Sequence, residues 1–171
     1  MKKNKLDIAK NLLSSGELVI FPTETVFGLG ADATNDEAVK SIFKVKKRPR
    51  SNPIICHFKS IKQIEKYFIL NKFEKKLGSK FWPGPLTIIL KKKKNSKIHF
   101  SASAGLNTIG VRFPKHKIAR SVLKETKFPL AMPSANKSTN ISPVKAEDVL
   151  DEFKKKVQLI IDGGRCKIGI E

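Results

Sequence analysis

Short apolar runs alternate with segments of helical period along this chain, and this alternation is its strongest constraint on the fold. The apolar runs predict strands at 18–21, 54–58, 86–90, 108–113, 129–132 and 157–162. Helical spacing predicts helices over 6–13, 61–68, 73–81, 117–124 and 143–153, and another that Thr34 or Asn35 caps. Strands and helices in alternation indicate an α/β fold.

The length and composition fit one domain, and we expect residues 1–171 to form it. The chain is 40% hydrophobic, which is enough for a core. It has no apolar run long enough to span a membrane, and charges interrupt the first 17 residues, so we expect a cytoplasmic protein. Cys56 and Cys166 lack metal-ligand spacing and are interpreted as reduced thiols.

The chain is strongly basic, with 35 Lys and Arg against 15 Asp and Glu and a net charge of +20. Such a charge attracts any polyanion, but exposed lysines such as the run 91–94 also fit a coding bias. The stretch "KVKKRPRSNP", 44–53, holds two of the few arginines, Arg48 and Arg50. Its cations suit a nucleic acid backbone, a phosphate-rich small molecule, or simply the C-terminal end of a helix dipole.

Several polar loops follow the predicted strands, at positions where open α/β sheets bind ligands. They read "PTET", "KKRPRSNP", "TIGVR", "PSANKS" and "DGG", and no Walker A, G-x-G-x-x-G or H-E-x-x-H sequence occurs. Each loop also has a structural interpretation. Thr23 and Thr25 suit a turn, His57 a buried strand, and Ser142 before Pro143 the start of the helix at 143–153.

In this order and spacing the loops resemble the YrdC/TsaC family of threonylcarbamoyl-AMP synthases, from about Gly16 to the last residue. The resemblance rests on "FPTETVFGLGADA", Lys46-x-Arg48-Pro49 followed by "NP", "WPGPLT", "TIGVRFP", "PSANKSTNISP" and "DGG". It implies a single twisted, mixed and mostly antiparallel sheet with flanking helices around a deep basic cavity. The family pattern continues into Ser-Thr-Val and a further strand where this chain ends at Glu171, so we expect this domain to lack that strand.

The resemblance also implies a set of site residues. It places three residues near L-threonine, namely Thr25, His57 and Arg112, and six around ATP, namely Lys46, Arg48, Asn52, Thr108, Ser134 and Ser142. Of these, Lys46 and Arg48 are the implied catalytic residues, and Asn136 is expected to fix its own loop. The residue types fit this chemistry, because a carboxylate suits an Arg fork and phosphates suit Lys, Arg and hydroxyl donors.

The implied reaction joins L-threonine, bicarbonate and ATP into threonylcarbamoyl-AMP, which passes to a tRNA threonylcarbamoyl-transfer complex. Mg²⁺ would enter with ATP, without a protein-bound metal. We expect Lys46 and Arg48 to point into the cavity, and Lys44, Lys47 and Arg50 to face solvent. Two rival interpretations are a basic module that binds tRNA or ribosomal RNA, and a carbamoyl-transfer domain of the hydrogenase-maturation type.

Overall fold

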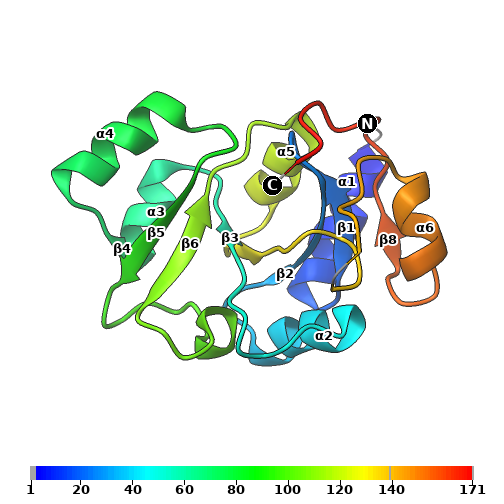
Figure 1. Ribbon diagram of the computed structural model, residues 1–171, viewed down its shortest axis with the longest axis horizontal. Coiled ribbons are helices and arrows are strands. Elements are labelled where there is room, and N and C mark those ends of the chain that lie inside the picture. Colours follow the sequence, from blue (N-terminus) through cyan, green and yellow to red (C-terminus); the bar gives the residue numbers. More distant parts are fainter. Residues whose placement is uncertain (1–2, 139, 171) are drawn as a thin grey trace.

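A computed structural model describes residues 3–138 and 140–170 of the chain. Eight strands of these residues form one mixed sheet in the order β4-β5-β6-β3-β7-β2-β1-β8 (Figure 1). Their bounds are β1 Val19–Pro22, β2 Phe27–Asp32, β3 Cys56–His57, β4 Phe68–Ile69, β5 Thr87–Lys92, β6 Thr108–Arg112, β7 Leu130–Ala131 and β8 Leu159–Ile160. Parallel pairing joins β3 to β6 and β1 to β8, and the other pairs are antiparallel. The predicted α/β fold with a mixed, mostly antiparallel sheet is confirmed.

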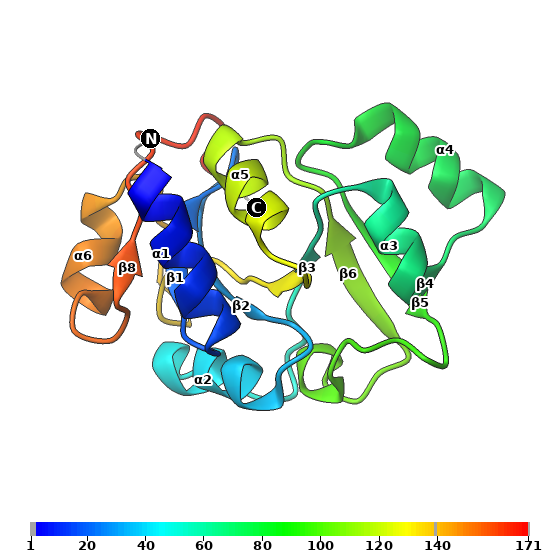
Figure 2. The ribbon, with the colours of Figure 1, turned by 180° about the vertical axis from the view of Figure 1, so that it is seen from behind.

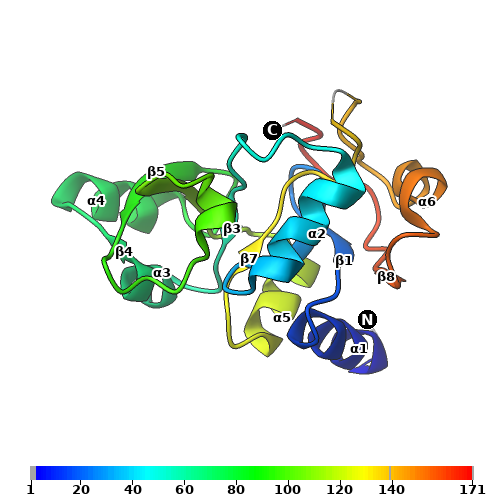
Figure 3. The ribbon, with the colours of Figure 1, turned by 90° about the horizontal axis from the view of Figure 1, so that it is seen from below.

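Six α-helices of the described residues flank the sheet: α1 Lys3–Ser14, α2 Asp36–Lys46, α3 Ile61–Tyr67, α4 Lys72–Phe81, α5 Lys117–Glu125 and α6 Glu147–Phe153. Figure 2 shows α1, α5 and α3 on one side of the sheet, and Figure 3 confirms this from below. The 3₁₀ helix η1, Phe100–Ser103, lies beside α2.

The two halves of the sheet are covered differently. In β1, Val19 and Phe21 pack on α1 and α5, while Ile20 packs into the other core, so this half is buried on both faces. In β5, Leu90 is buried but Ile89 is 70% exposed. The half formed by β5 and β6 is therefore exposed on one face around Ile89 and Thr108, whereas Arg112 at the other end of β6 is buried.

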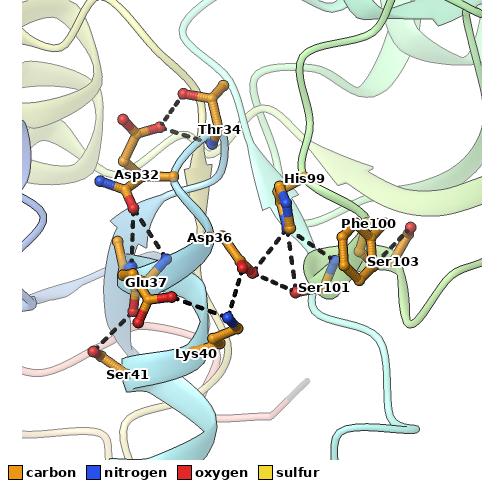
Figure 4. Close-up of polar contacts among 12 residues, drawn as sticks. Asp32, Thr34, Asp36, Glu37, Lys40, Ser41, His99, Phe100, Ser101 and Ser103 are labelled. Carbon is orange, nitrogen blue, oxygen red and sulfur yellow. Dashed lines mark hydrogen bonds and ion pairs between the residues drawn. The ribbon is translucent and has the colours of Figure 1, made fainter.

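The N-terminus of α2 is fixed by its cap and by contacts with η1. The Asn35 side chain accepts hydrogen bonds from the backbone N–H groups of Glu37 and Ala38. Next to it, an Asp36 oxygen accepts a 2.6 Å hydrogen bond from Ser101 and lies 2.9 Å from Nδ1 of His99 (Figure 4). These contacts hold α2 in place, and α2 carries the basic stretch at its other end.

The structure corrects several predicted elements. The chain over 27–32, for which no element was predicted, is strand β2. The predicted strand at 54–58 is shorter in the structure and consists of the two residues of β3. The predicted cap of the helix at 143–153 is wrong. Helix α6 begins at Glu147, and the carboxylate of Asp148, rather than Ser142, accepts hydrogen bonds from the backbone N–H groups of Val144 and Lys145. The chain over 141–144 is not helical, and the Pro143 carbonyl accepts a hydrogen bond from the N–H of Phe27 on β2.

Candidate active site

One face of β6 forms a flat surface, called the floor below, between the predicted site residues Thr108 and Arg112. Alternation along the strand puts Thr108, Gly110 and Arg112 on one face and buries the two residues between them on the other. A Cβ at Gly110 would lie 3.2 Å from Thr87 and 3.3 Å from Ile55, so only glycine leaves this floor uncrowded. Thr108 and Arg112 mark its two ends, roughly 13 Å apart along the strand.

Arg112, at the end of β6, is buried to 3% exposure and holds the "PTET" turn between β1 and β2. Its Nη2 donates to Oε1 of Glu24 at 2.8 Å, and its Nη1 donates to Oγ1 of Thr25 at 3.1 Å. Its Nε is buried and has no hydrogen-bond partner among the described residues. Arg112 therefore has one buried donor that its contacts with the "PTET" turn do not use.

His57 lies beside Arg112, because β3 and β6 are parallel and their register pairs these two residues. Its side chain is 2% exposed, and within the described residues neither ring nitrogen has a partner in hydrogen-bonding geometry. Burial, and then the charge of Arg112, hold the pKa of His57 well below its ordinary value, although the nearby Ile55 carbonyl partly opposes them. The imidazole is therefore neutral and offers one donor and one acceptor.

The threonines of the "PTET" turn have separate tasks. Thr23 is structural, since its Oγ1 accepts from the N–H groups of Thr25 and Val26 and donates to the Val26 carbonyl. The two threonine hydroxyl oxygens lie 2.9 Å apart, and that of Thr25 contacts Arg112. The structure thus brings together the three residues predicted for threonine: Thr25, His57 and Arg112.

Lys46 is buried to 1% exposure and turns towards the segment 134–136. Its ammonium donates to the carbonyls of Ser134 and Asn136 and to Oδ1 of Asn136. Asn136 in turn donates to the Asn140 carbonyl, and Ser134 forms an isolated bridge with Gly28 of β2. Lys46 therefore fixes the "SAN" loop, together with Asn136, for which that task was predicted.

Arg48 closes its own loop. Its Nε donates to the Asn52 carbonyl at 3.2 Å and its Nη2 to the Pro53 carbonyl at 2.8 Å, so these contacts brace the chain that leads from α2 to β3. Lys44, Lys47 and Arg50 are exposed, as predicted for the solvent-facing part of the stretch.

Two predicted residues lie apart from these groups. Thr108 is exposed at the far end of the floor from Arg112, and Ser142 is half-buried in the segment beside β2. A functional candidate that the sequence reasoning missed is Glu24, the buried partner of Arg112. The sequence carried a signal for it, because Glu24 is the only charged residue over 18–31 and a buried carboxylate needs a cation to pair with.

Comparisons with known proteins identify the family of this chain. The family model Sua5/YciO/YrdC, described as telomere recombination, matches residues 11–171. A threonylcarbamoyl-AMP synthase of Pyrococcus abyssi is 43% identical over 98% of this chain, and one of Bacillus subtilis is 43% identical over 95%. The match covers 49% and 47% of those proteins, so the chain spans about half the length of the curated relatives it matches.

Solved structures extend the likeness. The crystal structure of P. abyssi Sua5 complexed with L-threonine is 42% identical, with a TM-score of 0.96 over all of this chain and 50% of that one. A full-length HypF in its phosphate- and nucleotide-bound form shares the fold alone, at 24% identity and a TM-score of 0.85 over 97% of this chain and 26% of that one. By its motifs, its sheet and the extent of the family match, the chain belongs to the Sua5/YciO/YrdC family.

Proposed function

We propose that this chain carries the catalytic site of a threonylcarbamoyl-AMP synthase, which joins L-threonine, bicarbonate and ATP. The observation that carries the proposal is the pair His57 and Arg112, side by side with buried polar nitrogens that lack partners among the described residues. Buried donors without partners are costly, so a ligand that supplies acceptors is favoured there. The names of the relatives support the choice of reaction.

In this proposal the threonine carboxylate accepts from Arg112, and the hydroxyl of Thr25 and the neutral ring of His57 bind the polar groups of the amino acid. The fit rests on chemistry, because a guanidinium matches a carboxylate and a neutral imidazole can both donate and accept. A relative whose crystal structure is complexed with L-threonine supports the choice of this amino acid as the ligand.

ATP would lie along the floor of β6, with Thr108 at one end and the loops of Arg48, Asn52, Ser134 and Ser142 around its phosphates. Lys46 would act mainly by holding the "SAN" loop, with its positive charge close to the phosphates. The described residues contain no group of three or more His, Cys, Asp or Glu that could hold a metal ion. In this proposal Mg²⁺ would enter on the ATP phosphates, where it would offset their charge.

The reaction needs no protein nucleophile. The threonine amine adds to bicarbonate and water leaves, which gives a carbamate. A carbamate oxygen then forms a bond to the α-phosphorus of ATP while the bond to pyrophosphate breaks, which gives threonylcarbamoyl-AMP. The site would act by holding the reactants together, an effect that can lower a barrier by about 7–11 kcal/mol. The product would pass to a complex that transfers the threonylcarbamoyl group to tRNA.

Mass spectrometry tests the proposal directly. The purified protein is mixed with ATP, L-threonine, Mg²⁺ and ¹³C-bicarbonate, and threonylcarbamoyl-AMP carrying the label is expected together with an equal amount of pyrophosphate. Omitting threonine should abolish both products. Pyrophosphate without any labelled adduct, or no ATP turnover at all, would contradict the proposed reaction.

Binding of RNA is a second candidate role, as an accessory property of the same chain. The observation that favours it is the exposed group of Lys44, Lys47 and Arg50 at the end of α2, which no site interaction employs. A phosphate backbone would bind such a group through charge alone, with strong dependence on salt. No described helix is long and apolar enough to cross a membrane.

A further inference from the structure

We propose that Glu24 is a positioning residue, which sets the orientation of the Arg112 guanidinium so that its Nε faces the amino-acid site beside His57. This inference rests on the proposed function and assigns a task to the acidic residue of the "PTET" turn. The contact is an ion pair of 2.8 Å between side chains that are 4% and 10% exposed, for Arg112 and Glu24 respectively.

Glu24 is anchored from the other side as well. Its Oε1 accepts from Arg112, and its Oε2 accepts from the backbone N–H groups of Lys115 at 3.0 Å and His116 at 3.2 Å. These N–H groups lie immediately before α5, so the carboxylate is fixed to the chain that follows β6. A ligand carboxylate that displaced Glu24 would have to leave two backbone donors without an acceptor.

Glu24 is ionised, as a permanent ion-pair partner of Arg112 must be. Burial raises the pKa of Glu24, but the Arg112 charge and the hydrogen bonds from Arg112 and His116 outweigh it, and the pKa lies below its ordinary value. The carboxylate therefore stays ionised while the amino-acid substrate enters. Glu24 and Thr25 accept one hydrogen bond each from the two Nη atoms of Arg112, and its Nε is buried without a partner among the described residues. We therefore assign Nε as the donor that this arrangement keeps for the amino acid.

Replacement of Glu24 by Gln tests this geometry, since it keeps the shape and removes one acceptor. In either orientation the Gln amide NH₂ meets donors, either those of Arg112 or the backbone N–H groups of 115 and 116. We expect the Kd for L-threonine, measured by calorimetry, to rise about tenfold or more, with the Kd for ATP unchanged within twofold. The matched control is Glu37→Gln, because Glu37 is 82% exposed on α2 and its loss should change neither constant.

A second readout separates positioning from a loss of stability. In ¹H–¹⁵N spectra the Arg112 Nε–H signal, assigned with Arg112→Lys, should shift when L-threonine is added to the unaltered protein and should not shift in Glu24→Gln. If Glu24→Gln does not fold, Glu24→Asp decides. It keeps the charge but is one methylene too short to bridge Arg112 and the backbone, so it should also weaken threonine binding selectively.

The outcomes are distinct. An unaltered protein that binds no L-threonine refutes the proposed function itself. If the unaltered protein binds L-threonine and the folded Glu24 variants bind it equally well, or if they lose ATP and threonine affinity together, Glu24 is not a positioning residue for this site. A threonine affinity that increases in Glu24→Gln would also overturn the inference, because it would make Glu24 a competitor for Arg112.

Discussion

The stability of this protein should fall as the pH drops below 6.5, because His57 is buried as a neutral ring. Its pKa in the folded chain is held well below the ordinary 6.5 by burial and by Arg112. Below pH 6.5 the unfolded chain takes up a proton at this residue and the folded chain does not. The contribution of His57 to stability is thus complete above pH 6.5 and is lost as the pH falls towards the folded-state pKa.

The size of the pH effect on the free energy of unfolding follows from the uptake of one proton by the unfolded chain. Each pH unit below 6.5 removes about 1.4 kcal/mol from the free energy of unfolding, so the change between pH 7.5 and pH 5.5 is about 1.4 kcal/mol from His57 alone. The variant His57→Leu cannot titrate and should lack this part of the change. Other groups titrate alike in both proteins, so the difference between their pH profiles isolates His57.

Urea unfolding measures the effect, with the fluorescence of Trp82 as the signal. Trp82 is the one tryptophan of the sequence and is 6% exposed, so unfolding transfers it to water. Unfolding free energies of the two proteins are compared at pH 7.5 and pH 5.5. If both lose the same free energy on acidification, the imidazole of His57 is not held neutral, and its placement beside the Arg112 charge is wrong.

Two further predictions concern the cations. Arg112→Lys should weaken L-threonine binding about tenfold or more, since the planar guanidinium is lost, while Lys94→Ala should leave this affinity unchanged. If calorimetry finds the affinity of the unaltered protein in both variants, Arg112 has a structural role only. Arg48→Ala should abolish ATP-dependent pyrophosphate release and leave RNA affinity nearly unchanged. The Lys44/Lys47 double alanine variant should instead keep pyrophosphate release and lose RNA affinity, and the slope of log affinity against log salt concentration should become shallower by about two units. Undiminished ATP turnover in Arg48→Ala would exclude a role for it at the phosphates.

The sequence predicted the helices and most strands, because their apolar periods are long enough to be unambiguous. The strands at 19–22 and 108–112 were predicted in this way, and the cap at Asn35 was predicted from its residue type. The strand β2 was missed because "FGLGAD" contains two glycines, which suggest a loop locally. It is a strand because it pairs with β1 and β7, an effect of the tertiary structure that no local pattern carries.

The sequence indicated candidate site residues but not the contacts that they make in the structure. Register between β3 and β6 places His57 beside Arg112, but nothing local fixes that register. The lysine run at 91–94 shows the same limit. It was interpreted as a solvated surface, yet Lys92 donates to Ser103 at 2.7 Å and Lys93 to the Glu65 carbonyl, so only a part of the run is free of such contacts. Lys94 is therefore the better control for the Arg112 variant.

The two-residue strand β3 also has a consequence for how this domain opens. It joins β4-β5-β6 to the remaining strands of the sheet through only two residue pairs on each side, as few as in any pairing of the described strands, which makes it a weak line across the sheet. The bonds from Arg112 to Glu24 and Thr25 cross this line, from β6 to the turn before β2. In hydrogen–deuterium exchange the amides of Cys56 and His57 should therefore report local unfolding between the two halves, and an amino acid bound across the line should slow their exchange more than that of any amide in β1.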